Sequence, residues 1–138
     1  MNSNFEFLQD KFAIMLDLDD FKNINDKYGH AAGDRALVGV ADLLRQACRD
    51  SDDFIARMSG DEFLIVGERA STQEIVQLIE EIASSAKSYN EKCQSQCFIL
   101  PSMGYAVLKK GDTIDSFLAA ADQAMYKNKQ EHRVERRI

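Results

Sequence analysis

Apolar and polar residues alternate along the chain in blocks that predict strands and helices in turn. An apolar run beginning at Phe12 ends at acidic residues, which is typical of a buried strand that carries carboxylates at its end. Two helices follow, over residues 20–28 and 34–49, and the second places apolar residues at three- and four-residue intervals. Gly29 and Gly33 indicate a loop between these helices.

A predicted hairpin follows the second helix. Two short strand-like runs, 54–58 and 63–66, are separated by the polar connection Ser-Gly-Asp-Glu. Ser71 or Thr72 can cap a helix that extends to about residue 87. A further strand is predicted over residues 97–108, where Pro101 is tolerable only at a sheet edge or an irregularity, and Asp112 or Thr113 caps a last helix.

This order of elements predicts an α/β (α+β) fold with helices packed on a central sheet. The order is strand, helix, helix, strand, strand, helix, strand, helix, which resembles a ferredoxin-like or polymerase-palm arrangement. In such a sheet the first strand and the hairpin are plausible neighbours. We therefore expect Asp17 to lie close to Asp61 and Glu62.

Composition narrows the class of protein without choosing a function. The 138 residues, 45% hydrophobic and 29% charged, suit one globular domain over residues 1–138. The net charge of -6 argues against a nucleic-acid scaffold but permits a nucleotide bound through cations. No run of about 18 apolar residues and no secretory signal are present, so we expect a cytoplasmic chain without membrane insertion.

The three cysteines, Cys48, Cys93 and Cys97, do not form a recognisable metal site. The chain has two histidines, His30 and His132, and neither lies near them at a metal-ligand spacing. We expect reduced thiols that pack in the core or lie at the surface.

Two acidic clusters, one at the end of the first strand and one at the hairpin, are the first candidates for chemistry. The first contains Asp17, Asp19 and Asp20, and the second contains Asp61 and Glu62. Gathered carboxylates repel one another unless a cation lies among them, and Mg²⁺ binds one or two carboxylates together with substrate phosphates. The alternative for either cluster alone is a set of solvated acids at strand ends. The two clusters together favour a metal.

The segment 21–34 supplies candidate contacts to a nucleotide. Asn25 and Asp34 present an amide and a carboxylate that can bind a base edge, and Lys22 can reach a phosphate. Each has a structural alternative: Asn25 as a helix-surface amide and Asp34 as the cap of the following helix. His30 is equally consistent with a structural loop residue and with a ligand contact.

Four motifs together resemble the GGDEF domains, which are diguanylate cyclases. The stretches LDLDDFKNINDKYGHAAGD, ARMSGDEFLIV, SMGYAV and ADQAMYKNK follow the family pattern in order and spacing, over roughly residues 12–133. The resemblance implies that two GTP molecules are joined into cyclic di-GMP with release of pyrophosphate. It also implies a homodimer in which each protomer presents one GTP.

The resemblance also implies a role for each matching residue. Asp17 and the backbone carbonyl of Leu18 would bind metal, Mg²⁺ or Mn²⁺, together with Asp61. Asp61 would also serve as the base for the 3′-hydroxyl, supported by Glu62. The substrate contacts implied are Asn25 and Asp34 to guanine, His30 nearby, Ser59 and Gly60 at the phosphate turn, and Lys22, Lys129 and Arg133 to phosphates. A solvated basic tail is the alternative for Lys129 and Arg133.

The chain departs from the family pattern at several places. Ser59 replaces the first glycine of the signature, a mild change that we expect to be tolerated. His132 replaces the glycine usual between Lys129 and Arg133, so the basic pair can be aimed differently. The family's N-terminal Asp-x-Leu-Thr-Gly-Leu segment is missing, so we expect a short or lost first helix, with any upstream sensor domain outside this chain.

A further departure concerns product inhibition. The family's inhibitory motif is Arg-x-x-Asp, and Asp53 fills the aspartate position while Asp50 stands where arginine is expected. Arg49 and Asp52 repeat the motif one residue out of register. Because aspartate lacks the bidentate fork of arginine, the resemblance does not imply product inhibition for this chain.

Three functions remain open on the sequence. The first is an active diguanylate cyclase, which the intact Asp17, Asp61 and Glu62 favour. The second is a catalytically weak domain that binds GTP or cyclic di-GMP and signals through a partner. The third is a related nucleotide cyclase or palm polymerase that makes another cyclic nucleotide. Asp34 argues for guanine, because a carboxylate accepts from the N1 and N2 hydrogens of guanine, which adenine does not present.

Overall fold

The computed structural model describes residues 10–92 and 99–137 and contains a four-stranded antiparallel sheet. Its strands are β1 (Asp10–Leu18), β2 (Phe54–Ser59), β3 (Glu62–Arg69) and β4 (Pro101–Val107), in the spatial order β2-β3-β1-β4. β1 is central, with Asp17 opposite Glu62 of β3 and Ser102 of β4. The order is that of a ferredoxin-like sheet, so the predicted α+β class is confirmed.

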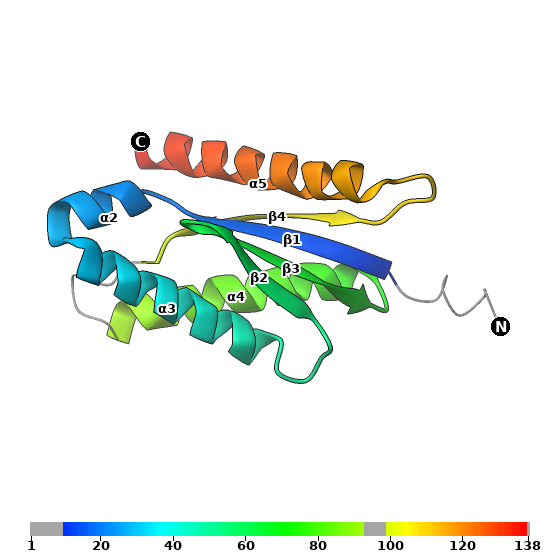
Figure 1. Ribbon diagram of the computed structural model, residues 1–138, viewed down its shortest axis with the longest axis horizontal. Coiled ribbons are helices and arrows are strands. Elements are labelled where there is room, and N and C mark those ends of the chain that lie inside the picture. Colours follow the sequence, from blue (N-terminus) through cyan, green and yellow to red (C-terminus); the bar gives the residue numbers. More distant parts are fainter. Residues whose placement is uncertain (1–9, 93–98, 138) are drawn as a thin grey trace.

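Helices cover both faces of the sheet and one of its ends (Figure 1). α3 (His30–Ala47) and α4 (Thr72–Lys92) pack on one face, and α5 (Ile114–Arg137) lies along the other. α2 (Phe21–Tyr28) follows the end of β1, and the C-terminal end of α5 extends toward that same end of the sheet. The carboxyl end of β1 is therefore the place where sheet, α2 and α5 converge.

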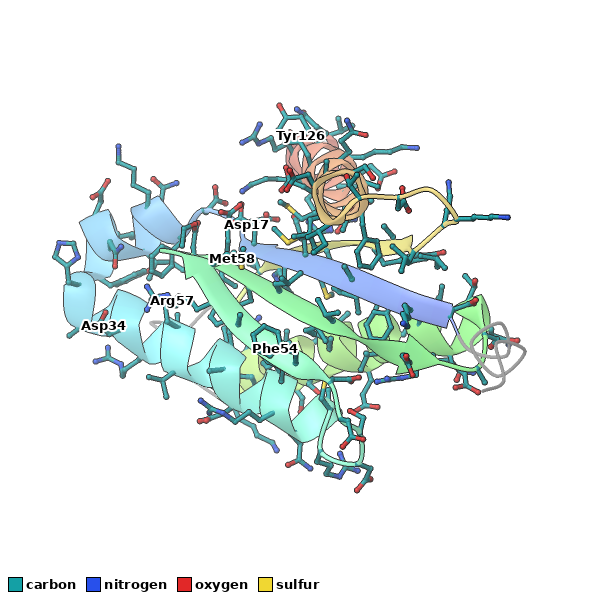
Figure 2. The ribbon with its side chains drawn as sticks, turned by 45° about the vertical axis from the view of Figure 1, so that its right-hand side comes forward. Asp17, Asp34, Phe54, Arg57, Met58 and Tyr126 are labelled. Atoms are coloured by element: carbon teal, nitrogen blue, oxygen red, sulfur yellow. The ribbon has the colours of Figure 1, made fainter. Side chains whose placement is uncertain are left out.

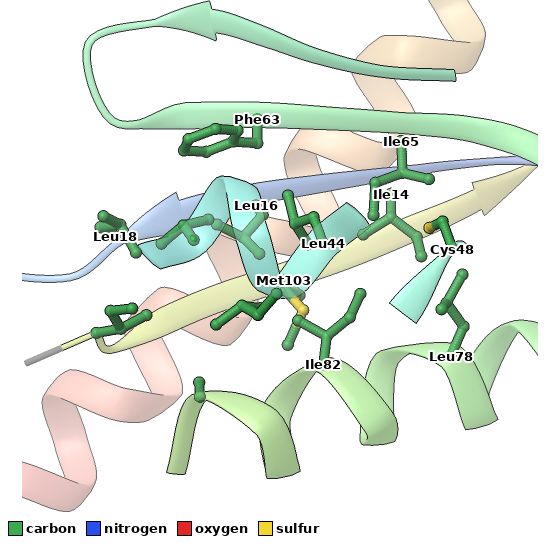
Figure 3. Close-up of a cluster of buried hydrophobic side chains, with 14 of the residues drawn as sticks. Ile14, Leu16, Leu18, Leu44, Cys48, Phe63, Ile65, Leu78, Ile82 and Met103 are labelled. Atoms are coloured by element: carbon green, nitrogen blue, oxygen red, sulfur yellow. The ribbon is translucent and has the colours of Figure 1, made fainter. Parts of the chain in front are cut away.

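Alternation along β1 builds two separate apolar cores. Phe12, Ile14, Leu16 and Leu18 are buried toward α3 and α4, in the larger apolar cluster. Figure 3 shows part of this cluster, with Ile14, Leu16 and Leu18 labelled. Ala13 and Met15 point to the other face, where they pack with Phe117, Ala121 and Met125 of α5. Asp17 follows in this second series, so strand periodicity directs its carboxylate to the α5 side.

Several boundaries differ from those predicted. α3 begins at His30 rather than residue 34, because Gly29 turns the chain with φ of 90° and Gly33 lies inside the helix rather than in a loop. α4 continues to Lys92, beyond the predicted end near residue 87. Ser71 caps α4 through its hydroxyl, and Pro101 is the first residue of the edge strand β4, as predicted.

Some expectations concern residues outside the described ranges, namely Cys93, Cys97 and the short N-terminal segment. Cys48 is buried in the larger core, and burial, followed by the neighbouring Asp53, raises the pKa of its thiol to about 12. It is the packing cysteine expected from the sequence. Within the described part of the chain, no helix is long and apolar enough to cross a membrane.

Candidate active site

The turn between β2 and β3 closes over the end of β1, which brings the two acidic clusters together. The backbone N–H of Leu18 donates to the carbonyl oxygen of Asp61 at 3.2 Å. Glu62 lies opposite Asp17 in the antiparallel ladder, so both side chains point to the same face of the sheet. The predicted proximity of Asp17 to Asp61 and Glu62 is confirmed by this register.

The Asp17 carboxylate is buried, and one of its oxygens lacks a partner. Oδ2 accepts a hydrogen bond from Nζ of Lys129 at 2.6 Å, whereas Oδ1 is buried with no hydrogen-bond partner among the described residues. Burial raises the pKa of Asp17; the bond from Lys129 opposes this shift and the adjacent Asp61 reinforces it. A carboxylate held in this way is suited to a further cation.

A cavity of about 240 Å³ opens beside these carboxylates. Its wall combines acidic and basic side chains from the end of β1, the start of α2, the turn and α5. The lining residues are Leu18, Asp19, Asp20, Phe21, Lys22, Asn23, Asp61, Lys129 and Arg133. The structure thus brings the predicted phosphate contacts Lys22, Lys129 and Arg133 to one place, and Lys129 is not part of a solvated tail.

The serine that replaces a glycine at the turn has a bonding partner of its own. The Ser59 hydroxyl donates to Oε1 of Glu62 at 2.6 Å, and the Nε of Arg57 donates to the carbonyl of Gly60 at 2.9 Å. The loop is shorter than predicted, because Ser59 and Glu62 pair as the last and first residues of β2 and β3. Ser59 therefore orients the Glu62 carboxylate, a contact that glycine cannot make.

The predicted guanine contacts lie at the corner between α2 and α3, outside that cavity. A methyl group at Gly33 would collide with Oδ1 of Asn25, so the bare glycine is what seats Asn25 against the first turn of α3. Asp34, the next residue of that turn, is exposed on α3 and apart from Asp17 (Figure 2). His30 is the exposed first residue of α3. The N-cap interpretation of Asp34 is wrong, since the helix begins four residues earlier.

A buried polar cluster beside the cavity was missed from the sequence. Asp19 accepts hydrogen bonds at both oxygens, from the Ser102 hydroxyl at 2.6 Å and from Nδ1 of His132 at 2.9 Å. The sequence pattern groups Asp19 with the candidate metal-binding acids, and it marks His132 as a replacement of the family glycine. No local pattern links residues 19, 102 and 132, so the sequence carried no direct signal for the cluster.

Asp53, which stands at the position of the family's inhibitory aspartate, forms an ion pair with Arg69. Both oxygens of Asp53 accept from Arg69, at 2.9 and 2.7 Å, and the Arg69 guanidinium lies 5.1 Å from the ring centre of Phe12. Burial raises the pKa of Asp53, but the bonds from Arg69, Ser51 and Cys48 outweigh it and hold the pKa below its usual value. This aspartate is already saturated by a partner of its own chain.

The donor set at the end of β1 suits a hard divalent cation that is completed by a ligand. Within residues 10–92 and 99–137, no group of three or more His, Cys, Asp or Glu side chains is arranged to hold a metal by itself. Mg²⁺ and similar ions need only one or two carboxylates when phosphate and water oxygens supply the rest. Asp17 with its unpartnered oxygen and Asp61 beside it fit that requirement.

Comparison with known proteins identifies relatives over nearly the whole chain. The family model described as "Diguanylate cyclase, GGDEF domain" matches residues 5–135. Diguanylate cyclase A of Treponema denticola is 32% identical over 135 residues, which cover 96% of this chain and 36% of that protein. Diguanylate cyclase DgcP of Pseudomonas aeruginosa is 35% identical over 122 residues, covering 87% of this chain and 18% of that protein. The chain thus spans about a third or less of the length of these relatives.

Solved structures agree with the sequence comparison. The GGDEF domain of TpbB (YfiN) from Pseudomonas aeruginosa superposes with a TM-score of 0.80 at 32% identity, covering 94% of this chain and 76% of that one. The GGDEF domain of DgcB from Caulobacter crescentus, solved in complex with c-di-GMP, gives 0.80 at 28% identity, covering 91% and 75%. The sheet order, the acidic turn over β1 and these relatives agree: the chain belongs to the GGDEF domain family of diguanylate cyclases.

Proposed function

We propose that this domain condenses two GTP molecules into cyclic di-GMP and releases two molecules of pyrophosphate. GTP is the substrate of the family. The observation that carries the proposal for this chain is the Asp17 carboxylate, buried beside Asp61 with Oδ1 unpartnered and with Lys22, Lys129 and Arg133 around the adjoining cavity. Acids that gather cations and bases that bind phosphate are both needed for transfer at an α-phosphate.

Cyclases of this family generally depend on a metal ion, and we propose Mg²⁺ or Mn²⁺ for this chain. Asp17, Asp61 and the backbone carbonyl of Leu18 would hold it. The ion would lower the pKa of the attacking hydroxyl and neutralise charge on the phosphates. This assignment uses the unpartnered oxygen of Asp17, which otherwise costs stability as a buried acceptor without a donor.

The other side chains of the site bind the phosphates, bind the guanine or transfer the proton. Lys22, Lys129 and Arg133 bind the β- and γ-phosphates, and Asn25 with Asp34 binds the guanine edge at the corner of α2 and α3. Asp61 takes the proton of the 3′-hydroxyl. That oxygen then bonds to the α-phosphorus of the second nucleotide, and the bond from this phosphorus to the pyrophosphate oxygen breaks.

Glu62 supports this proton transfer and is itself held by Ser59. The 2.6 Å bond from the Ser59 hydroxyl fixes the direction of the Glu62 carboxylate. The serine variant of the signature therefore adds an orienting contact at the turn. His30, at the exposed start of α3, is proposed as a further contact to the substrate.

Catalysis requires a homodimer, because one domain that holds one GTP cannot supply the second. Two sites must face each other about an approximate two-fold axis, so that each 3′-hydroxyl meets the α-phosphate of the opposite nucleotide. Activity should therefore rise more steeply than linearly with protein concentration. Domains outside this chain, such as a sensor, are natural candidates for controlling that encounter.

Incubation of the purified domain with GTP and Mg²⁺, followed by chromatographic separation of the products, tests the proposal. Cyclic di-GMP should form together with two equivalents of pyrophosphate, and chelation of the metal should stop it. GTP that binds at high protein concentration without forming a cyclic dinucleotide would instead identify a binding domain. ATP serves as the control substrate, because adenine lacks the N1 and N2 hydrogens that Asp34 would accept.

A further inference from the structure

Three polar side chains from distant parts of the chain meet beside the proposed phosphate site. The Ser102 hydroxyl lies 2.6 Å from Oδ1 of Asp19, and Nδ1 of His132 lies 2.9 Å from Oδ2. The same Nδ1 lies 3.0 Å from the Ser102 hydroxyl, which closes a triangle. Ser102 is fully buried and Asp19 nearly so, whereas His132 reaches the cluster from the partly exposed side of α5.

The position of each hydrogen follows from the chemistry of the three groups. A carboxylate only accepts, so the single hydroxyl hydrogen of Ser102 is directed to Oδ1 of Asp19. Nδ1 of His132 faces the other carboxylate oxygen, so it must carry a hydrogen and donate it. The network therefore assigns Nδ1 of His132 as a hydrogen-bond donor.

Asp19 and Ser102 form a fixed base for this contact. The backbone N–H of Asp19 donates to the carbonyl of Leu100 at 2.7 Å, and Ser102 lies in β4 opposite Asp17 of β1. Asp19 therefore directly follows the end of β1, and Ser102 lies near the start of the paired strand β4. Through His132, the last part of α5 is tied to the same strand ends that carry the proposed metal ligands.

The helical spacing places His132 with the two basic residues of the site. Lys129 lies three residues before His132 and four residues before Arg133 on α5, so His132 and Arg133 flank Lys129 on the same side of the helix. Lys129 donates to Asp17, and Arg133 lines the cavity. One turn earlier, Oδ1 of Asn128 accepts from the backbone N–H of Met103 at 2.9 Å. Figure 1 shows this part of α5 above the end of β1 and close to α2.

We propose that His132 is a positioning residue, whose Nδ1 bond to the Asp19–Ser102 pair sets where α5 presents Lys129 and Arg133 to the β- and γ-phosphates of GTP. This role rests on the proposed function for the identity of the ligand. The family pattern predicted glycine here, which has no side chain to form the link. In this chain the basic pair is therefore held by a side-chain clamp.

The test compares ligands with and without the outer phosphates. The probes are GMP and a GTP analogue with a methylene group between the α- and β-phosphates, which cannot release pyrophosphate. His132→Ala should weaken binding of the analogue about tenfold, the usual scale for charge-assisted hydrogen bonds, and leave GMP binding within about twofold. Equal losses for both ligands would indicate a general structural effect and overturn the proposal.

Two amides of different length form the matched control pair. In His132→Asn the side-chain N–H can take the place of Nδ1, whereas in His132→Gln it is displaced by one methylene to the place of Nε2. Asn should therefore restore binding of the analogue and Gln should not. Recovery by Gln that equals or exceeds recovery by Asn would contradict the assignment of Nδ1.

A double-mutant comparison tests whether His132 acts through the basic pair. In a background of Lys129→Ala and Arg133→Ala, His132→Ala should cause no further loss of analogue binding. An additional loss as large as that in the wild-type background would show that His132 acts independently of them, and the proposal would fail.

Hydrogen exchange in the ligand-free protein separates failure of this inference from failure of the proposed function. Backbone amides around residues 129–133 should exchange faster in His132→Ala and at the wild-type rate in His132→Asn. That result would support the clamp even if the wild-type protein formed no cyclic di-GMP. Unchanged exchange in His132→Ala would overturn the clamp even in an active cyclase.

Discussion

Two buried aspartates at opposite ends of the sheet, each paired with one basic residue, differ in how fully they are bonded. Asp53 receives two hydrogen bonds from the Arg69 guanidinium, and its pKa is lowered. Asp17 receives one bond from Lys129 at Oδ2, keeps Oδ1 unpartnered, and its pKa is raised by burial despite that bond. The first pair is complete within the chain, and the second is incomplete without a ligand.

The choice of base accounts for much of this difference. The planar guanidinium of Arg69 bonds both carboxylate oxygens at once, whereas the ammonium of Lys129 is a point charge that bonds one. The Arg69 guanidinium also lies over the ring of Phe12. Beside Asp17 stands Asp61, a like charge that a cation can neutralise. A saturated pair stabilises the fold, and an unsaturated one is available for chemistry.

The largest expected effect is loss of activity at the unsaturated end. Asp61→Asn removes one proposed metal ligand and base, so cyclic di-GMP formation should fall by a factor on the order of 10³ or more. The fold should persist, because Leu18 bonds to the backbone carbonyl of Asp61 rather than to its side chain. Product chromatography together with thermal unfolding checks both parts. Activity within tenfold of wild type would contradict the assigned role.

At the saturated end the main loss should be one of stability. Asp53→Asn leaves the partly buried guanidinium of Arg69 without a counter-charge and should lower the free energy of unfolding by about 3 kcal/mol. Urea denaturation measures this difference. Asp52→Asn changes an exposed neighbour and is the matched control, with an expected change within about 0.5 kcal/mol. Equal losses of stability in Asp53→Asn and Asp52→Asn would show that the ion pair of Asp53 with Arg69 does not stabilise the fold.

A conservative change of the base tests whether the bidentate geometry matters. Arg69→Lys keeps the charge but loses one of the two hydrogen bonds that the guanidinium donates to Asp53, and should cost about 1.5 kcal/mol of unfolding free energy. Arg45→Lys is the control, since the pair of Arg45 with Asp42 is exposed and should contribute almost nothing. Similar losses in both variants would show that the fork of Arg69 is unimportant.

The smallest expected effect is a gain in stability at the unsaturated end. With divalent ions chelated, Asp17→Asn removes a charge that burial and Asp61 disfavour, and should raise the free energy of unfolding by about 1 kcal/mol at neutral pH. Because the native pKa of Asp17 is raised, this gain should appear as pH rises through that pKa and vanish in acid. For Asp53, whose native pKa is lowered, the stabilisation should be lost as pH falls through it.

Denaturation series over pH, run on both asparagine variants and the wild type, measure these dependences. The wild type should exceed Asp53→Asn in stability at neutral pH, and the difference should shrink in acid. The wild type should have a lower free energy of unfolding than Asp17→Asn at neutral pH, and the two values should converge in acid. A destabilised Asp17→Asn at neutral pH would mean that the bond from Lys129 outweighs burial and the charge of Asp61.

Much of the fold was predictable, because apolar periodicity is a local property of the sequence. The order of elements and the hairpin over Asp61 and Glu62 followed from it, and so did the neighbourhood of Asp17. The start of α3 did not, since the same glycines that suggested a loop serve as a one-residue turn at Gly29 and as a seat for Asn25 at Gly33. Local propensity does not reveal what a neighbouring helix places against a glycine.

The candidate site was predictable in its residues and less so in its contacts. The bonds from Ser59 to Glu62, from Arg69 to Asp53 and from His132 to Asp19 have no counterpart in the motifs that identified the family. Each joins side chains whose separation depends on strand register or on the docking of α5. A motif specifies which side chains are present but does not specify their hydrogen-bond partners.

The sequence by itself determined the elements, the family resemblance and the acids that strand alternation carries to the end of β1. The tertiary structure alone decided that Lys129 meets Asp17 across 112 positions of the chain, that Asp53 is saturated and Asp17 is not, and that His132 joins α5 to the strand ends. The physical reason is that periodicity acts between neighbours along the chain. Hydrogen bonds and charges act between neighbours in space, which only the packing of α5 and the pairing of the strands bring together.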